Sequence, residues 1–84
     1  MTKWREAAIG FSIDPIEVSG LNVWEEEWRP VDAPEVMLPH PAYPKQIHHY
    51  KIYEIGDVCR PVRFAAAELS NQVWGFYVPD KTSE

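Results

Sequence analysis

The stretch VRFAAAELSNQVWGFYVP (Val62–Pro79) decides the fold of this 84-residue chain. Two runs rich in branched and aromatic residues flank Ser70 and Asn71, which are residue types that favour turns. The stretch therefore predicts a β-hairpin. An alternative is a short helix over RFAAAEL, because alanine, glutamate and leucine are strong helix formers.

The register of this hairpin can be predicted from side-chain size. Pairing Leu69 with Gln72 sets small residues opposite large ones. The expected pairs are Ala67 with Trp74, Ala65 with Phe76, and Phe64 with Tyr77 on the reverse face.

The segment before the hairpin, QIHHYKIYEIG (Gln46–Gly56), alternates with period two. One predicted face carries Ile47, His49, Lys51, Tyr53 and Ile55, and the other carries His48, Tyr50, Ile52 and Glu54. Branched and aromatic residues on both faces favour a strand. Gly56-Asp57 then predicts the turn into the hairpin.

The first half of the chain is less regular. LNVWEEEWRPV (Leu21–Val31) alternates, which predicts a strand with Trp24 and Trp28 on one face and Glu25 and Glu27 on the other. Pro30 ends this strand or confines it to a sheet edge. A further strand is expected from about Ala8 to Ile13, and a short extended piece from Ile16 to Val18.

Together these elements predict a mainly β fold, or a small α+β fold, built on an antiparallel meander and hairpin. We expect a single compact domain over residues 1–79 and a frayed tail over residues 80–84. Hydrophobic residues make up 45% of the chain, which is enough for a packed core and too many for a disordered segment.

The net charge of −5 comes entirely from the first half, residues 1–42, which contains eight acidic and three basic residues. An acidic chain lacks the basic surface that nucleic-acid binding requires, so we expect no nucleic-acid partner. The N-terminal residues MTKWREAAIG break the apolar run that a signal peptide needs, and no apolar run approaches the length of a membrane span. A cytoplasmic protein without membrane contact is expected.

Three strings, IDPIEVSGLNVWEEEWRPV, LPHPAYP and VRFAAAELSNQVWGFYVP, resemble small uncharacterised bacterial proteins encoded by mobile integron gene cassettes. The resemblance runs over nearly the whole chain. It implies a bacterial accessory gene of the mobile metagenome whose product works without dedicated host partners. It implies no activity and no functional residues.

LPHPAYP (Leu38–Pro44) holds three of the eight prolines. Its PxxP spacing could dock as a polyproline helix, but we interpret it as a stiff extended connector, because prolines push the residues before them toward extended conformations. His40, His48 and His49 lack the converging spacing of a zinc site, so we expect neither metal nor cofactor. Cys59 and the serines stand in no catalytic motif, and we expect no enzyme.

The most informative feature for function is aromatic. Four tryptophans and four tyrosines exceed what so small a core can enclose, because tryptophan is rarely fully buried. We therefore predict a non-enzymatic binding module, working as a homodimer or other homo-oligomer through an aromatic surface. The candidate residues are Trp24, Trp28, Glu26, Tyr43 and Tyr50. The alternative is a small-molecule-binding protein whose aromatic and acidic cleft takes a cationic or planar ligand.

Overall fold

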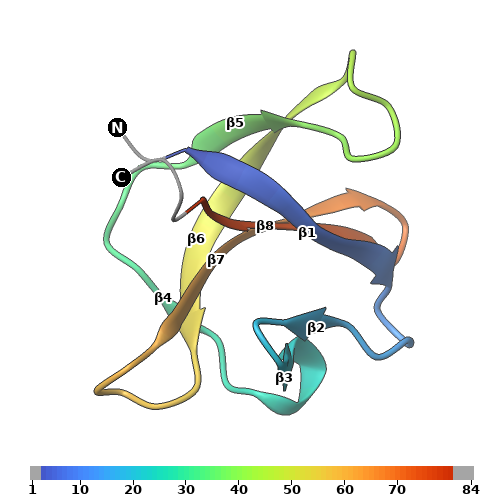
Figure 1. Cartoon of the computed structure of the whole chain (residues 1–84). Coiled ribbons are helices and arrows are strands. Elements are labelled where there is room, and N and C mark those ends of the chain that lie inside the picture. The colour runs from blue at the N-terminus through green and yellow to red at the C-terminus, as the bar shows by residue number, and fades with distance from the viewer. Residues whose placement is uncertain (1–2, 81–84) are drawn as a thin grey trace.

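A computed structural model of the chain, which describes residues 3–80, confirms a mainly antiparallel β domain (Figure 1). One turn of 3₁₀ helix is the only helical element within these residues. The elements in chain order are β1 (Trp4–Phe11), β2 (Glu17–Val18), β3 (Leu21–Asn22), η1 (Val23–Glu25), β4 (Arg29–Pro30), β5 (Val36–Pro39), β6 (Ile47–Ile55), β7 (Val62–Ser70) and β8 (Val73–Pro79). None of these is a helix long and apolar enough to cross a membrane.

The C-terminal half forms the predicted meander. Strands β6, β7 and β8 pair in sequence, β1 pairs with β8, and β4 pairs with the free edge of β6, giving the order β1-β8-β7-β6-β4. The predicted strand over Gln46–Gly56 is β6, and the helical alternative for RFAAAEL is wrong because those residues lie in β7. Gly56, with φ of 84°, leads the chain out of β6 in a conformation that glycine adopts without a Cβ clash.

The predicted hairpin register is wrong by one residue. Ala65 pairs with Tyr77, Ala66 with Phe76, and Ala67 with Gly75. The cause is the turn: Gln72 has a positive φ of 64°, and the register shifts between Glu68 and Ser70, so Leu69 is the extra residue of a β-bulge. A shift of one residue gives every side chain a partner from the other face of the opposing strand.

The sheet buries side chains on both faces. The front face carries Ile55, Phe64, Ala66, Phe76 and Val78, and the β2–β3 hairpin adds Ile16 and Val18 to the same cluster. The back face carries Tyr50, Ala65, Ala67 and Tyr77, against which Trp4, Val36 and Leu38 pack. The alanines of the central strand β7 leave room for tyrosine and phenylalanine from its neighbours.

Two tyrosines hold β5 over the back face. The hydroxyl groups of Tyr50 and Tyr77 both donate to the carbonyl oxygen of Pro39, at 3.2 and 2.8 Å. Tyr77 belongs to β8, which β6 and β7 separate from β5 in the sheet. The sheet must therefore curl strongly, and Trp4 of β1 packs against the same back-face cluster as Val36 and Leu38 of β5.

The expected strand over Leu21–Val31 does not form. Asn22 caps a 3₁₀ turn, because its Oδ1 accepts a hydrogen bond from the backbone N–H of Trp24 at 3.0 Å. Alternation therefore does not set the directions of Trp24 and Trp28. The expected strand over Ala8–Ile13 is also displaced, since β1 runs from Trp4 to Phe11.

LPHPAYP is not an extended connector. Leu38 and Pro39 end β5, and the rest forms the tight loop that leads into β6. His40, which is 8% exposed, closes this loop because its Nδ1 accepts from the backbone N–H groups of Ala42 and Tyr43 at 2.9 and 3.2 Å. The prolines thus lie in a hairpin loop in which the His40 side chain accepts the hydrogen bonds of the Ala42 and Tyr43 backbone N–H groups.

At the C-terminal end, the predicted tail began at residue 80. The backbone N–H of Asp80 donates to the carbonyl oxygen of Lys3 at 2.7 Å. Residues 81–84 lie outside the described part of the chain.

Candidate ligand-binding groove

Trp28 is the centre of an aromatic cluster on the front face. Its ring stacks on Trp24 with a centroid distance of 5.5 Å and an angle of 18°. It also contacts four rings of the sheet at 5.1–5.9 Å: Tyr53, Phe64, Trp74 and Phe76. The indole N–H donates to the carbonyl oxygen of Val23 at 2.7 Å, which fixes the ring. Both tryptophans pack against the domain's own core.

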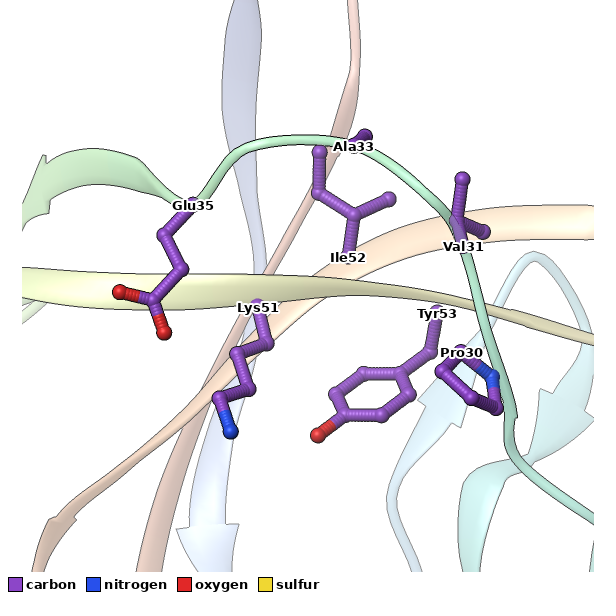
Figure 2. Close-up of a pocket in the computed structure, with 7 residues that line it drawn as sticks. All are labelled: Pro30, Val31, Ala33, Glu35, Lys51, Ile52 and Tyr53. Carbon is purple, nitrogen blue, oxygen red and sulfur yellow. The ribbon is translucent and has the colours of Figure 1, made fainter.

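A groove runs along β6 beside this cluster. Its first cavity, of about 370 Å³, lies between β6 and the segment that links β4 to β5. The lining residues are Pro30, Val31, Ala33, Glu35, Lys51, Ile52 and Tyr53. Figure 2 shows Lys51 and Tyr53 projecting from one side of β6, with Pro30 beside the Tyr53 ring, while Ile52 points the opposite way toward Ala33.

The roof of this cavity is a chain excursion at the sheet edge. Pro30 pairs with Tyr53 and Val36 pairs with Tyr50. The edge segment therefore advances by six residues while β6 advances by three. The surplus residues must leave the plane of the sheet. They carry Glu35 over β6, and Figure 2 shows its carboxylate on the same side as the Lys51 ammonium group.

A second cavity, of about 250 Å³, continues the groove toward β8. It shares Glu35, Lys51 and Tyr53 with the first and adds His49, Ala66, Ala67, Glu68 and Trp74. Glu68 pairs directly with Trp74 across the β7–β8 hairpin, so its carboxylate stands beside an indole. We call the two cavities together the β6 groove.

The charged groups of the β6 groove face solvent. Glu35 Oε1 lies 3.6 Å from His49 Nδ1, and the two side chains are 45% and 65% exposed. An ion pair this exposed contributes little to stability and exists only when the imidazole is protonated. Glu35 and Glu68 therefore remain available to a bound cation, and Lys51 to a hydrogen-bond acceptor.

The structure does not gather the five residues predicted for the aromatic surface. Trp24, Trp28 and the half-exposed Glu26 lie around η1, at the end of the molecule far from the β5–β6 loop (Figure 1). Tyr43 is 60% exposed on that loop, against the ring of His40. Tyr50 is fully buried, which corrects its placement on a surface: the phenol fills the back-face core and donates to Pro39.

Sequence reasoning missed Glu35, Glu68 and Trp74 as groove residues. Alternation did place His49, Lys51 and Tyr53 on one face of β6. Nothing local in the sequence brings the other three to that face, because Glu35 arrives through the excursion and Glu68 and Trp74 through the corrected hairpin register.

Two further features of the described residues bear on chemistry. Within residues 3–80, no three histidine, cysteine or acidic side chains gather closely enough to hold a metal ion. Cys59 is an exposed free thiol whose backbone N–H donates to Asp57 Oδ1 at 2.9 Å. Comparison with known proteins finds no significant match among family models, curated proteins or solved structures.

Proposed function

We propose that this protein is a non-enzymatic binding module whose ligand site is the β6 groove. The observation that carries the proposal is the meeting of two open cavities at Tyr53, with Glu35 and Lys51 shared between them. The ligand class is a small planar molecule that carries a positively charged group and a hydrogen-bond acceptor.

Aromatic faces and carboxylates act together on such a ligand. A cation over a tyrosine or tryptophan ring gains roughly 0.5–1 kcal/mol at an exposed site, and more as water is displaced. Glu68 stands beside Trp74, and Glu35 lies beside the cavity wall that Tyr53 forms. The Lys51 ammonium group, which lines both cavities, donates to the acceptor of the ligand.

The openness of the groove favours recognition over catalysis. Glu35, Lys51 and Glu68 are all exposed, so water reaches each charged group. Enzymes commonly exclude water from the reacting groups, whereas this groove leaves a bound molecule partly exposed to water.

The test addresses the planar and cationic part of this ligand class with two molecules of the same shape and different charge, benzamidine and benzamide. We expect benzamidine to shift the NMR signals of Tyr53 and the Trp74 indole N–H in a saturable way, and benzamide to bind several-fold more weakly. Glu35→Gln and Glu68→Gln should each weaken benzamidine binding by about 1.5- to five-fold, the range that the roughly 0.2–1 kcal/mol of an exposed ion pair corresponds to.

Glu25→Gln is the matched control, since it removes the same charge from η1, outside the groove lining. Benzamidine should bind this variant like the wild type. Equal binding of benzamidine and benzamide, or saturable shifts confined to residues outside the groove, would contradict the proposal.

A cytoplasmic location and a bacterial accessory role complete the proposed function. The accessory role rests on the resemblance of three strings to integron-cassette proteins. Expression of the gene with a C-terminal fluorescent tag in a bacterial host, followed by fractionation, tests the location.

A further inference from the structure

One edge of the sheet is left open. Strand β1 pairs with β8 along one side, and within residues 3–80 no strand pairs with its other side. A free strand edge presents backbone N–H and C=O groups that can pair with another chain.

The opposite edge of the sheet is protected by proline. The segment that pairs with the outer side of β6 carries Pro30, Pro34 and Pro39, which have no backbone N–H to donate. Strand β1 has no proline and runs for eight residues. The two edges of the sheet therefore differ: β1 can accept a further strand up to Phe11, whose carbonyl oxygen instead accepts from the backbone N–H of Asp14 at 3.0 Å.

A bulge turns apolar side chains of β1 toward solvent. Glu6 pairs with Tyr77 and Ala8 with Phe76, so Ala7 is an extra residue. Beyond it, Ala8 packs into the front-face core, whereas Ile9 and Phe11 pair with Gly75 and Val73 on the back face. Ile9 is 42% exposed and Phe11 is 51% exposed.

We propose that the open edge of β1 pairs antiparallel with β1 of a second copy of this chain, about a two-fold axis near Ile9. The two sheets then form one continuous sheet. Ile9 and Phe11 of each copy meet those of its partner across the seam, which removes their apolar surface from water.

Charge complementarity favours a second copy in the antiparallel direction. The segment from Lys3 to Glu6 carries a net charge of +1, and Asp14 lies just beyond the other end of β1. Antiparallel pairing brings the basic end of each strand near the acidic end of its partner, whereas parallel pairing would bring like charges together.

The same geometry limits the assembly to two chains. A two-fold contact uses the same surface on both copies, and the proline-bearing edge stops the sheet from growing at its far ends. The seam is smaller than a standard protein interface of about 1,600 Å², so we expect a dimer that forms in the micromolar to millimolar range. This proposal is independent of the β6 groove, none of whose lining residues belongs to β1.

Sedimentation equilibrium from micromolar to millimolar protein tests the proposal. We expect the wild-type mass to rise from one chain to two, and no further. Phe11→Lys should remain monomeric throughout. Met37→Lys is the matched control, because Met37 is 63% exposed on β5 and the substitution adds the same charge to the other edge of the sheet. This control should dimerise like the wild type.

Amide hydrogen exchange of the wild type gives a second readout that does not depend on any variant folding. The outward-facing amides of β1 should exchange at least several-fold more slowly at millimolar than at micromolar concentration, while those of β5 should not change. A single-chain mass at every concentration would overturn the proposal. So would a dimer that protects other residues, or one that Phe11→Lys and Met37→Lys weaken equally.

Discussion

Replacing Trp28 by alanine separates a core role for this residue from a role in self-association. The indole contacts five aromatic rings at centroid distances of 5.1–5.9 Å and donates a hydrogen bond of 2.7 Å to Val23. Truncating a core tryptophan costs about 3–5 kcal/mol, and the partial exposure of Trp28 places it near the lower value. A domain of this length has a total stability of only about 4–13 kcal/mol.

We therefore expect Trp28→Ala to lower the free energy of unfolding by about 3 kcal/mol, measured by urea denaturation with far-UV circular dichroism. Trp28→Phe keeps a ring in the cluster but loses the donor to Val23, so its loss should be smaller, on the order of 1–2 kcal/mol. Tyr43→Ala removes an aromatic ring that is 60% exposed and should change stability by less than about 1 kcal/mol.

The result that would refute the core role is a stable Trp28→Ala variant. A loss below about 1 kcal/mol, the level expected of an exposed site, together with a lower mass in solution, would place Trp28 between two copies. That outcome would restore the sequence-based expectation that Trp24 and Trp28 form the self-association surface.

Three further predictions concern the core and the β5–β6 loop. Burial, followed by the charges of Tyr77 and Glu6, raises the pKa of Tyr50 from 10.0 to about 12. As the pH rises, the unfolded chain loses the Tyr50 hydroxyl proton before the folded chain does, so the free energy of unfolding should be constant below pH 10 and fall by roughly 2–3 kcal/mol as the pH approaches 12. Urea denaturation at a series of pH values checks this. The fall should be smaller in Tyr50→Phe. His40→Ala leaves the N–H groups of Ala42 and Tyr43 without their acceptor and should lower the free energy of unfolding by about 1–3 kcal/mol in thermal or urea denaturation. An unchanged stability would mean that water replaces Nδ1. Ala66→Leu should overpack the front face opposite Phe76 and destabilise by about 1–3 kcal/mol, and an unchanged denaturation midpoint would argue against the observed register.

The architecture of the C-terminal half follows from local patterns. Strict alternation over Ile47–Ile55 and the branched and aromatic runs around Ser70-Asn71 predict strands, and the structure has them as β6, β7 and β8. Local patterns could not supply the register, because it depends on a bulge at Leu69 and a positive φ at Gln72. Both lie at the turn between β7 and β8.

In the first half of the chain, tertiary packing overrides the local pattern. The alternation of Trp24, Glu26 and Trp28 is that of a strand, but the Asn22 side chain offers the backbone a competing hydrogen bond and starts a 3₁₀ turn. The tryptophans then fold onto the sheet, where burial against Phe64 and Phe76 outweighs the local preference for an extended chain.

The sequence by itself determined that this protein is a small antiparallel β domain rich in aromatic rings. Only the tertiary structure decided which rings reach solvent and beside which charges. Glu35 meets His49 across fourteen positions, and Tyr53 and Trp74 line one cavity across twenty-one. Such neighbours depend on sheet curvature and on a chain excursion at its edge, which arise from the packing of the whole domain and leave no periodic signal in any one segment.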